Sequence, residues 1–419
     1  MMSRVAIVGQ GYVGLPLARE AIKAGLDVIG VDLDAERVAG LNAGRSHVDD
    51  LSDSDIAAMV TDGYRATADF AEIADAGDVV ICVPTPLTDD GEPDLRPLRR
   101  AAREVAAQLR PGMLVVVEST TYPGTTDEVV RPLLEANGLV AGVDFNLAFS
   151  PERIDPGNTL FGVGNIPKIV GGHTPACGDR AAMFYQKLVS DVVRVRGTRE
   201  AEMAKLLENT YRHVNIALVN DMVRFCREVG IDLWDVIDAA ATKPFGFQAF
   251  RPGPGVGGHC IPIDPRYLSH NVRARLGQPF RFVELAQEIN DSMPAYVAER
   301  IGGRLGADGI DLADAKVLLL GITYKADVAD TRETPAAPLI RILRTLGAEV
   351  SYHDPFVTRW DLDGESLHSV ADLPAAIGEA DICVLLQPHR AYDLEAVAGA
   401  ARRLLDTRGV TTGTTVERL

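Results

Sequence analysis

The chain opens with apolar runs of strand length that alternate with a segment of helical periodicity. Arg4–Val8 is apolar, the pattern from about Leu15 to Ala24 is helical with Gly25 as its stop, and Val28–Val31 is apolar again. Apolar spacing of this kind predicts strand, helix and strand in that order. The segment is therefore expected to form a βαβ unit of a parallel sheet.

The turn between the first strand and the helix reads Gly9-Gln-Gly11-Tyr12-Val13-Gly14, and Asp32 follows the second strand. Gly9 permits a tight turn, Gly11 lets the backbone approach a pyrophosphate at the helix N-terminus, and Gly14 lets helix and strand pack closely. Asp32, 23 residues after Gly9, is placed to accept hydrogen bonds from ribose hydroxyls and to repel a 2′-phosphate. The unit predicts dinucleotide binding, with NAD favoured over NADP.

Further strands are expected at 79–83, 114–118 and 146–149, and each runs into a polar turn that contains proline. Because the carboxyl ends of the strands in a doubly wound sheet face the ligand, these turns should line the cofactor cleft. The hydroxyls expected there are Thr85, next to Pro84, and Thr120; Thr121 and Thr125 could equally cap the next helices. Glu152, after the third of these strands, is either a carboxylate that activates water or a partner for Arg153.

The middle of the chain carries the helical pattern furthest, from about Thr198 to Val229. Lys205 and Asn209 lie one turn apart on one face, where an ammonium and an amide can converge on one ligand oxygen. Glu202 and Glu208 offer the alternative of a solvated salt-bridge face, which is the commoner arrangement on an arbitrary helix. A helix this long also offers a dimerisation face.

One loop, 251–265, contains four glycines, four prolines, Cys260 and Asp264. Such a run cannot be regular helix or strand, because proline fixes φ and glycine permits positive φ, so it should wrap a ligand close to its backbone. Another helical stretch, from Phe282 to about Leu305, connects this loop to the C-terminal part.

The C-terminal part repeats the opening pattern, with strands at 316–321, 350–353 and 381–386 and a helix at 335–346. Gly347 precedes Asp354 by seven residues, as Gly25 precedes Asp32. The glycine motif is missing, and Lys325 and Arg332 occupy a longer connection. This second half should therefore bind a different phosphate-bearing ligand through side-chain charge.

The fold class expected from these patterns is α/β, with two Rossmann-like doubly wound domains joined by a long-helix central domain. The expected domains are residues 1–197, 198–305 and 306–419.

Composition excludes several classes of protein. A net charge of −17 over 419 residues argues against a general nucleic-acid or anionic-membrane binder. No apolar run reaches the ~20 residues of a membrane span, and the N-terminus passes directly into a strand without a signal peptide. Five scattered cysteines without paired spacing suggest neither a disulfide framework nor a metal site. A reducing cytoplasm fits best.

The motifs together resemble the family of NAD-dependent nucleotide-sugar 6-dehydrogenases, which includes the UDP-glucose, UDP-N-acetylglucosamine and UDP-N-acetylmannosamine dehydrogenases. The resemblance covers nearly the whole chain. It rests on Gly9-x-Gly-x-x-Gly14, Val83-Pro-Thr-Pro86, Glu118-Ser-Thr120, Ser150-Pro-Glu152, Lys205-x-x-x-Asn209, the glycine-rich run that ends in Cys260-x-x-x-Asp264, and Lys325 with Asp330-x-Arg332.

The resemblance implies oxidation of the C6 hydroxyl of a nucleotide-diphospho-hexose to a carboxylate with two NAD, in uronic acid and polysaccharide biosynthesis. Cys260 as a thiolate would trap the aldehyde and form a thioester that water cleaves. Lys205 and Asn209 would stabilise oxyanions, Asp264 would orient a base or water, and Thr120 and Glu152 would hold and activate water.

The resemblance also implies binding residues and an assembly. The cofactor would contact Gly9, Gly11, Tyr12, Val13, Gly14, Asp32, Pro84, Thr85, Thr120 and Arg332. The substrate would contact Glu152, Arg153, Lys205, Asn209, Arg251, Gly257 and Lys325. The long helical segment implies a homodimer or a higher homo-oligomer.

The residues around Cys260 and Lys243-Pro-Phe-Gly-Phe247 favour an N-acetylhexosamine over glucose as the sugar. UDP-glucose and dTDP-glucose stay open as alternatives, because the short Leu405-Asp-Thr-Arg-Gly-Val segment does not decide the nucleobase. His259 suggests a Cys–His dyad, but neighbouring residues in an extended loop point apart. A two-electron hydroxy-acid or alcohol dehydrogenase and a non-catalytic nucleotide-sugar sensor are the alternatives from other classes.

Overall fold

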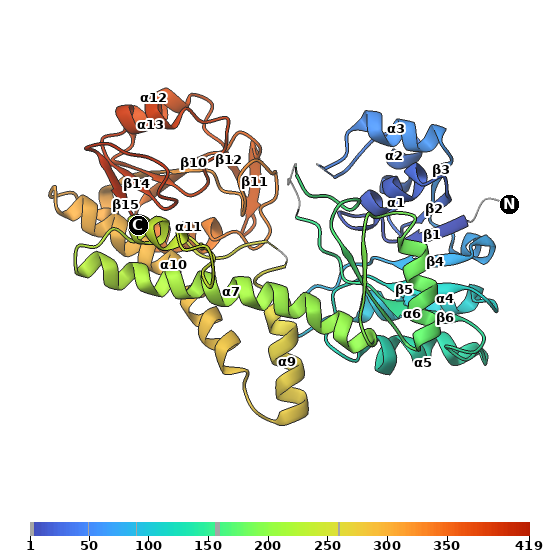
Figure 1. The fold of residues 1–419 in the computed structure, drawn as a ribbon. Coiled ribbons are helices and arrows are strands. Elements are labelled where there is room, and N and C mark those ends of the chain that lie inside the picture. Colours follow the sequence, from blue (N-terminus) through green and yellow to red (C-terminus); the bar gives the residue numbers. More distant parts are fainter. Residues whose placement is uncertain (1–3, 49, 89, 156–159, 259) are drawn as a thin grey trace. The chain divides into compact units, whose positions relative to one another are not determined.

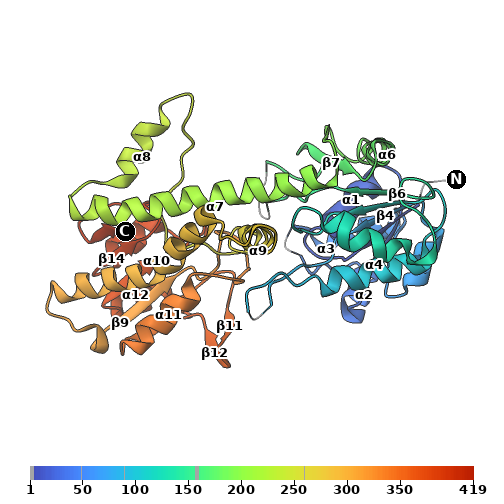
Figure 2. The same cartoon turned by 90° about the horizontal axis from the view of Figure 1, so that it is seen from below.

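The computed structural model describes residues 4–48, 50–88, 90–155, 160–258 and 260–419. The chain forms two compact units. The first contains Met1–Glu208 and Arg266–Gln278, and the second contains Asn209–Pro265 and Pro279–Leu419. Each unit is built on its own β-sheet flanked by helices (Figures 1 and 2).

The sheet of the first unit has eight strands in the order β3-β2-β1-β4-β5-β6-β7-β8. Neighbouring strands are parallel except for the pair β6 and β7. Its order begins 3-2-1-4-5-6, the arrangement of a dinucleotide-binding sheet. The strands are β1 (Arg4–Val8), β2 (Asp27–Val31), β3 (Tyr64–Thr67), β4 (Asp78–Ile81), β5 (Leu114–Val117), β6 (Asn146–Phe149), β7 (Lys168–Gly172) and β8 (Val192–Arg194).

Helices flank this sheet, and their bounds follow the amphipathic pattern of the sequence. The α-helices are α1 (Gly14–Lys23), α2 (Ala35–Asn42), α3 (Asp53–Thr61), α4 (Arg96–Gln108), α5 (Arg131–Leu134) and α6 (Pro175–Tyr185). Shorter turns are η1 (Phe70–Asp75), η2 (Thr126–Val130) and η3 (Glu135–Asn137). The strand β5 reads Leu-Val-Val-Val and is buried at every position, as expected of a parallel strand covered on both faces.

The second unit has a parallel five-stranded sheet in the order β10-β9-β13-β14-β15 and a separate hairpin of β11 and β12. The strands are β9 (Lys316–Leu320), β10 (Glu349–His353), β11 (Arg359–Leu362), β12 (Glu365–His368), β13 (Ile382–Leu385), β14 (Leu404–Asp406) and β15 (Val416–Arg418). The helices of this unit are α8 (Leu233–Ala241), α10 (Arg281–Gly306), η4 (Leu312–Asp314), α11 (Ala336–Thr345), α12 (Leu373–Glu379) and α13 (Leu394–Ala400).

Alternation along β9 shows why this second sheet is also covered on both faces. Val317 and Leu319 belong to the core shared with α10 and α11, whereas Leu318 and Leu320 belong to the core shared with α12 and α13. Successive side chains of a strand point to opposite faces, so the two cores lie on opposite sides of the sheet. The predicted fold class, α/β with two Rossmann-like domains and a helical region, is confirmed.

Two further helices carry or position residues of the candidate site. The helix α7 (Thr198–Glu228) is 31 residues long and matches the predicted long helix. The helix α9 (Asp264–Leu276) was not predicted, and it takes in the last two residues of the expected glycine-proline loop. Within the first unit, the hydroxyl of Tyr267 on α9 donates to the carbonyl of Thr85 at 2.9 Å, so α9 packs on the turn after β4.

The internal repeat predicted from the sequence is present in backbone detail. The N–H of Gly9 donates to Val31 at 2.7 Å and that of Gly321 donates to His353 at 2.9 Å. The N–H of the next residue then donates to the acid after the second strand, Asp32 at 2.9 Å in one half and Asp354 at 2.8 Å in the other.

The two acids differ in their remaining partners. Asp354 also pairs with Nε2 of His389 at 3.1 Å, and both side chains are fully buried. Asp32 instead accepts from Arg37 at 2.9 Å and keeps an 8% exposed side chain. The acid is therefore fully buried in the second half, whereas in the first half it keeps some exposure.

Among the residues that the structure describes, no helix is both long and apolar enough to cross a membrane.

Candidate functional site

The glycine turn of the first unit has the shape that a dinucleotide needs. A Cβ on Gly14 would lie 1.9 Å from the carbonyl oxygen of Gly9, and a Cβ on Gly9, where φ is 95°, would lie 2.6 Å from that of Cys82. A Cβ on Gly11 would meet no atom within 4 Å, so this position faces open space. Two of the three glycines therefore pack against the protein and the third faces open space, which is the arrangement that the motif requires.

The N-terminus of α1 is open to an anion. Its N-cap, Val13, makes no side-chain cap hydrogen bond, and the first turn contains no acidic residue. By contrast, the side chain of Asp34 caps α2 and that of Ser52 caps α3. Uncapped N–H groups and the helix dipole together favour a phosphate at α1. The described residues therefore fit a dinucleotide.

Asp32 is held in place but keeps the capacity to accept. One carboxylate oxygen takes the N–H of Gln10 and the Arg37 guanidinium, and the other takes the N–H of Asp34 at 3.0 Å. The Gln10 side chain is itself fixed, donating to Ile7 and accepting from Tyr64, each at 2.7 Å. A carboxylate has about four lone-pair positions, so ribose hydroxyls can still donate to Asp32.

The turns after β4 and β5 are tied together. The Thr85 hydroxyl donates to the carbonyl of Thr120 at 2.8 Å, and the Ser119 hydroxyl donates to that of Val83 at 2.7 Å. Thr125 bonds to Tyr122 within its own turn at 2.7 Å. The Thr121 hydroxyl is buried and has no partner among the described residues. Thr85 thus shapes the turn that presents Thr120.

Glu152 is buried and accepts hydrogen bonds from several groups. Its carboxylate accepts the N–H of Arg153 at 2.6 Å, and its carbonyl accepts from the Lys205 ammonium at 2.5 Å. The Arg153 guanidinium turns elsewhere, to Glu208 at 2.7 Å and to the carbonyl of Pro167 at 2.7 Å. Glu152 is therefore no ion-pair partner of the Arg153 guanidinium.

The face of α7 around Lys205 is organised by long-range bonds. Glu202, fully buried, accepts from the N–H groups of Gly124 and Thr126 at 2.6 and 2.8 Å, and Glu208 pairs with Arg153. The Lys205 side chain is only 7% exposed and reaches Glu152, so the solvated salt-bridge arrangement does not describe this face.

In the second unit, Asn209 is the anchor of the loop that carries the cysteine. Its amide donates to the Asp264 carboxylate at 2.5 Å, and the N–H of Asp264 donates to the carbonyl of Cys260 at 2.8 Å. All five cysteines are free; four are buried and Cys260 is half-buried. Burial raises the pKa of the Cys383 thiol to about 12 and that of Cys82 well above its ordinary value, so neither is suited to act as a thiolate.

The loop before Cys260 lies directly on the C-terminal Rossmann-like domain. The N–H of Gly258 donates to the carbonyl of Arg332 at 3.1 Å. A Cβ on Gly257 would lie 2.7 Å from the carbonyl oxygen of Glu333 and 2.7 Å from Cβ of Tyr324. Only glycine fits there, so the predicted role of Gly257 rests on close backbone approach.

Charged side chains gather at the carboxyl end of the second sheet. Arg332 forms a bidentate pair with Asp330, with its Nε 2.9 Å from one carboxylate oxygen, and Lys325 lies half-buried in the same connection. Arg251 pairs with Asp238 at an exposed position. His259 lies outside the described residues.

Arg408 was not identified from the sequence. Its Nε donates to the carbonyl of Leu386 at 2.7 Å, and its Nη1 would lie 2.9 Å from a Cβ on Gly253 of the cysteine loop. Burial lowers the pKa of Arg408 to about 10, which still leaves it charged at neutral pH. Its signal was the Asp-Thr-Arg sequence at the end of β14, because the carboxyl end of a parallel strand is a usual position for a ligand-binding residue.

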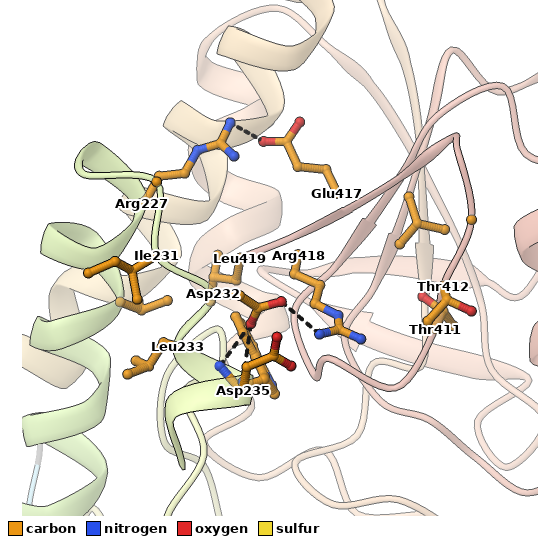
Figure 3. Close-up of a pocket in the computed structure, with 15 residues that line it drawn as sticks. Arg227, Ile231, Asp232, Leu233, Asp235, Thr411, Thr412, Glu417, Arg418 and Leu419 are labelled. Carbon is orange, nitrogen blue, oxygen red and sulfur yellow. Dashed lines mark hydrogen bonds and ion pairs between the residues drawn. The ribbon is translucent and has the colours of Figure 1, made fainter. Parts of the chain in front are cut away.

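A cavity of about 610 Å³ lies elsewhere in the second unit. It is lined by the end of α7, the start of α8 and the C-terminal segment, and no predicted site residue lines it. Figure 3 shows two ion pairs in its lining, Arg227 with Glu417 at 2.7 Å and Arg418 with Asp232 at 2.9 Å. The candidate site residues lie instead at the glycine turn of the first unit and at the cysteine loop of the second unit.

Comparison with known proteins gives the family. Residues 3–189 match the NAD-binding domain of the UDP-glucose/GDP-mannose dehydrogenase family, 199–292 its central domain and 318–413 its UDP-binding domain. The chain belongs to the UDP-glucose/GDP-mannose dehydrogenase family. It is an oxidoreductase with an NAD-binding domain, as the sequence predicted.

Several relatives of this UDP-glucose/GDP-mannose dehydrogenase chain are similar over most of its length. A UDP-N-acetyl-D-mannosamine dehydrogenase of Salmonella typhi is 33% identical, over 97% of this chain and 98% of that protein. A UDP-N-acetyl-D-glucosamine 6-dehydrogenase of Pseudomonas aeruginosa is 36% identical, over 85% and 84%. The solved structure of a UDP-D-ManNAc dehydrogenase from Pyrococcus horikoshii is 32% identical and superimposes with a TM-score of 0.89, over 99% and 98% of the two chains.

Proposed function

We propose that this dehydrogenase oxidises the C6 hydroxyl of a UDP-N-acetylhexosamine, with UDP-N-acetylmannosamine favoured, to the uronic acid by way of a Cys260 thioester. The observation that carries the proposal is the bond from Asn209 to Asp264, because it anchors the Cys260 loop to α7 one helical turn from Lys205. The names of the relatives support the sugar, and the sequence around Cys260 independently favours an acetamido substituent.

The proposed reaction has four steps. NAD, when bound, accepts a hydride from C6, and in each of the two oxidations the hydroxyl proton passes to solvent by way of a base. Between them, the Cys260 thiolate adds to the aldehyde carbon and gives a thiohemiacetal, whose oxidation gives a thioester. Water then attacks the thioester carbon, and the carbon–sulfur bond breaks to release the acid and the thiolate. The balance is one alcohol, two NAD⁺ and one water to one carboxylate, two NADH and three protons.

Each predicted catalytic residue has a role in this scheme. Lys205 and Asn209 stabilise the oxyanion that forms when sulfur or water adds to the carbon. Thr120 holds the attacking water, and Glu152 takes its proton. Asp264 fixes the Asn209 amide, a placement supported by their hydrogen bond. Burial of Glu152 and Lys205, and the half-buried state of Cys260, are consistent with these roles.

The binding residues come from both Rossmann-like domains and from the central segment between them. We assign the cofactor to the turn Gly9–Gly14 with Asp32, Pro84, Thr85 and Thr120, and we retain Arg332 as a further cofactor contact. We assign the sugar nucleotide to Arg153, Arg251, Gly257 and Lys325. The bare N-terminus of α1 supports the first assignment, and the charged connection of the second domain supports the second.

The proposal includes an assembly and a compartment. Exposed apolar side chains repeat along one face of α7 and suit a partner helix in a homodimer. They are Leu207, Tyr211, Leu218, Met222 and Phe225. Five free cysteines support a reducing, cytoplasmic compartment. The division into domains at 197 and 305 is retained as a proposal.

The test is an NADH assay with UDP-N-acetylmannosamine, UDP-N-acetylglucosamine, UDP-glucose and dTDP-glucose. We expect two NADH for each UDP-N-acetylmannosamine consumed. Cys260→Ala should lose nearly all turnover while NAD binding is retained, and Cys177→Ala is the matched control because Cys177 is buried outside the site. One NADH per sugar, or full turnover in Cys260→Ala, would refute the thioester route.

A further inference from the structure

A buried cluster of ionisable side chains lies behind Glu152, and the reaction scheme uses only one of its members. Lys168, the first residue of β7, places Nζ 2.9 Å from Oε2 of Glu118 and 3.5 Å from Oε2 of Glu152. The hydroxyl of Tyr185 on α6 donates to the other oxygen of Glu118. The side chains of Lys168 and Glu118 are 6% and 0% exposed, so the cluster is sealed except towards Glu152.

Lys168 supplies the positive charge that the two buried carboxylates of this cluster require. Burial by itself lowers the pKa of Lys168, but the carboxylates of Glu118 and Glu152 outweigh it, and the pKa is raised. Burial raises the pKa of Glu118, against the effect of Lys168. Two carboxylates thus share one ammonium in the interior, where an unpaired charge is strongly unfavourable. The Tyr185 ring, with its centroid 5.3 Å from Nζ, fixes the ammonium from a further side.

The other charged groups near Glu152 leave its Oε2 to Lys168. Oε1 takes the backbone N–H groups of Arg153 and of the residue after it. Lys205 donates to the main-chain carbonyl of Glu152 and the Arg153 guanidinium pairs with Glu208. Cys82, at the end of β4, is buried with a raised pKa and carries no charge.

A small cavity lies against the same carboxylate. Its volume is about 10 Å³, and Glu152 and Lys168 are among the residues that line it. That volume is close to the room that one water molecule requires.

We propose that Lys168 is a positioning residue for this enzyme: it holds Oε2 of Glu152 in place, so that Glu152 can take a proton from water. Glu118 and Tyr185 in turn hold Lys168. The inference rests on the proposed function, because it assigns a partner to the base that cleaves the thioester. In this role Lys168 only orients a base, and no additional reactant is needed.

The test is steady-state kinetics, followed by NADH absorbance with UDP-N-acetylmannosamine. Lys168→Met removes the ammonium that lies 3.5 Å from Oε2 of Glu152, so the base should no longer be held in place. We expect kcat to fall on the order of tenfold to a hundredfold, with KM for NAD nearly unchanged. In a Glu152→Gln background, where the base is already absent, Lys168→Met should lower kcat no further.

Three further variants make the result decisive. Lys168→Arg keeps the charge and should restore kcat towards that of the parent. Lys168→Met leaves the buried Glu118 carboxylate without its cation, so the double variant Lys168→Met with Glu118→Gln, which keeps the net charge of the parent cluster, serves if the single variant does not fold. It should show the same fall in kcat. Lys187→Met is the control, since Lys187 is an exposed lysine of the same unit.

An unchanged kcat in Lys168→Met or in the double variant, with only a lower melting temperature, would overturn the inference and leave the proposed function standing. A parent enzyme that produces no NADH from any of the four sugar nucleotides would overturn both.

Discussion

Glu202 should make the stability of this enzyme depend on pH in a way that one substitution can remove. It is fully buried at the start of α7 and receives three hydrogen bonds, from the N–H of Gly124, the N–H of Thr126 and the Thr126 hydroxyl, at 2.6 to 2.8 Å. Burial raises the pKa of Glu202 to about 7, although the bonds from Thr126 and Gly124 oppose the rise.

The sign and size of the effect follow from this pKa. The folded-state pKa lies above the ordinary value of 4.5, so the folded protein binds the proton more tightly than the unfolded chain. The stabilisation is fully present below pH 4.5 and is lost as the pH rises through about 7. A difference of about 2.5 units at 1.36 kcal/mol each amounts to about 3 kcal/mol for this one side chain. No discount for solvent applies, because the side chain is not exposed.

The experiment compares urea unfolding of the parent protein and of Glu202→Gln from pH 5 to pH 8. Glutamine does not titrate, so the difference in unfolding free energy between the two proteins should change by about 2 to 3 kcal/mol across the range, with the parent losing relative stability as the pH rises. Glu200→Gln, an exposed position on the same helix, is the control and should leave the curve unchanged. Parallel pH curves for the parent and Glu202→Gln would show that this carboxyl does not titrate as described.

Three other predictions concern the cofactor, the cysteine loop and the assembly. Asp32→Ser should raise the ratio of kcat/KM for NADP over NAD by about tenfold or more, since ~1.4 kcal/mol of lost repulsion suffices; an unchanged ratio would contradict the role of Asp32. Gly257→Ala should lower the free energy of unfolding by about 1 to 3 kcal/mol because its Cβ overlaps the neighbouring domain. Gly303→Ala, in open space on α10, should instead stabilise by about 0.5 to 1 kcal/mol, and thermal melting distinguishes the two. Phe225→Glu, at a 65% exposed position of α7, should convert a dimer to a monomer in sedimentation velocity, whereas Arg212→Glu, at an exposed position away from this face of the same helix, should not.

Local sequence patterns were enough to predict most of the fold. The βαβ unit from Arg4 to Val31, the long helix from Thr198 and the repeat that begins at Lys316 are each marked by apolar period and by glycine stops, so their type and limits are close to those predicted. The helix α9 was missed because Asp264 and Pro265 end a glycine-proline run, and that run reads as loop. An acid and a proline are nevertheless ordinary residues for the first turn of a helix.

The site was predictable where its residues are neighbours in the sequence and not where contacts are distant. Lys205 and Asn209 share a helix, so their spacing alone predicts a common face. Lys168 meets Glu118 across 50 residues of sequence, and its isolated position before an apolar strand gives no sign of a buried partner. Arg408 likewise gains its meaning only from the packing of the cysteine loop on the second sheet.

The enclosed Asp354 has a consequence for how the two halves respond to their ligands. In the first half, Asp32 and the uncapped N-terminus of α1 can form further hydrogen bonds with a ligand. NAD should therefore slow proteolysis of that domain in proportion to its occupancy. In the second half, His389 pairs with the equivalent acid, Asp354, so a side chain of the protein itself occupies this position. The two halves share one architecture, but only the first leaves its acid partly exposed to a ligand.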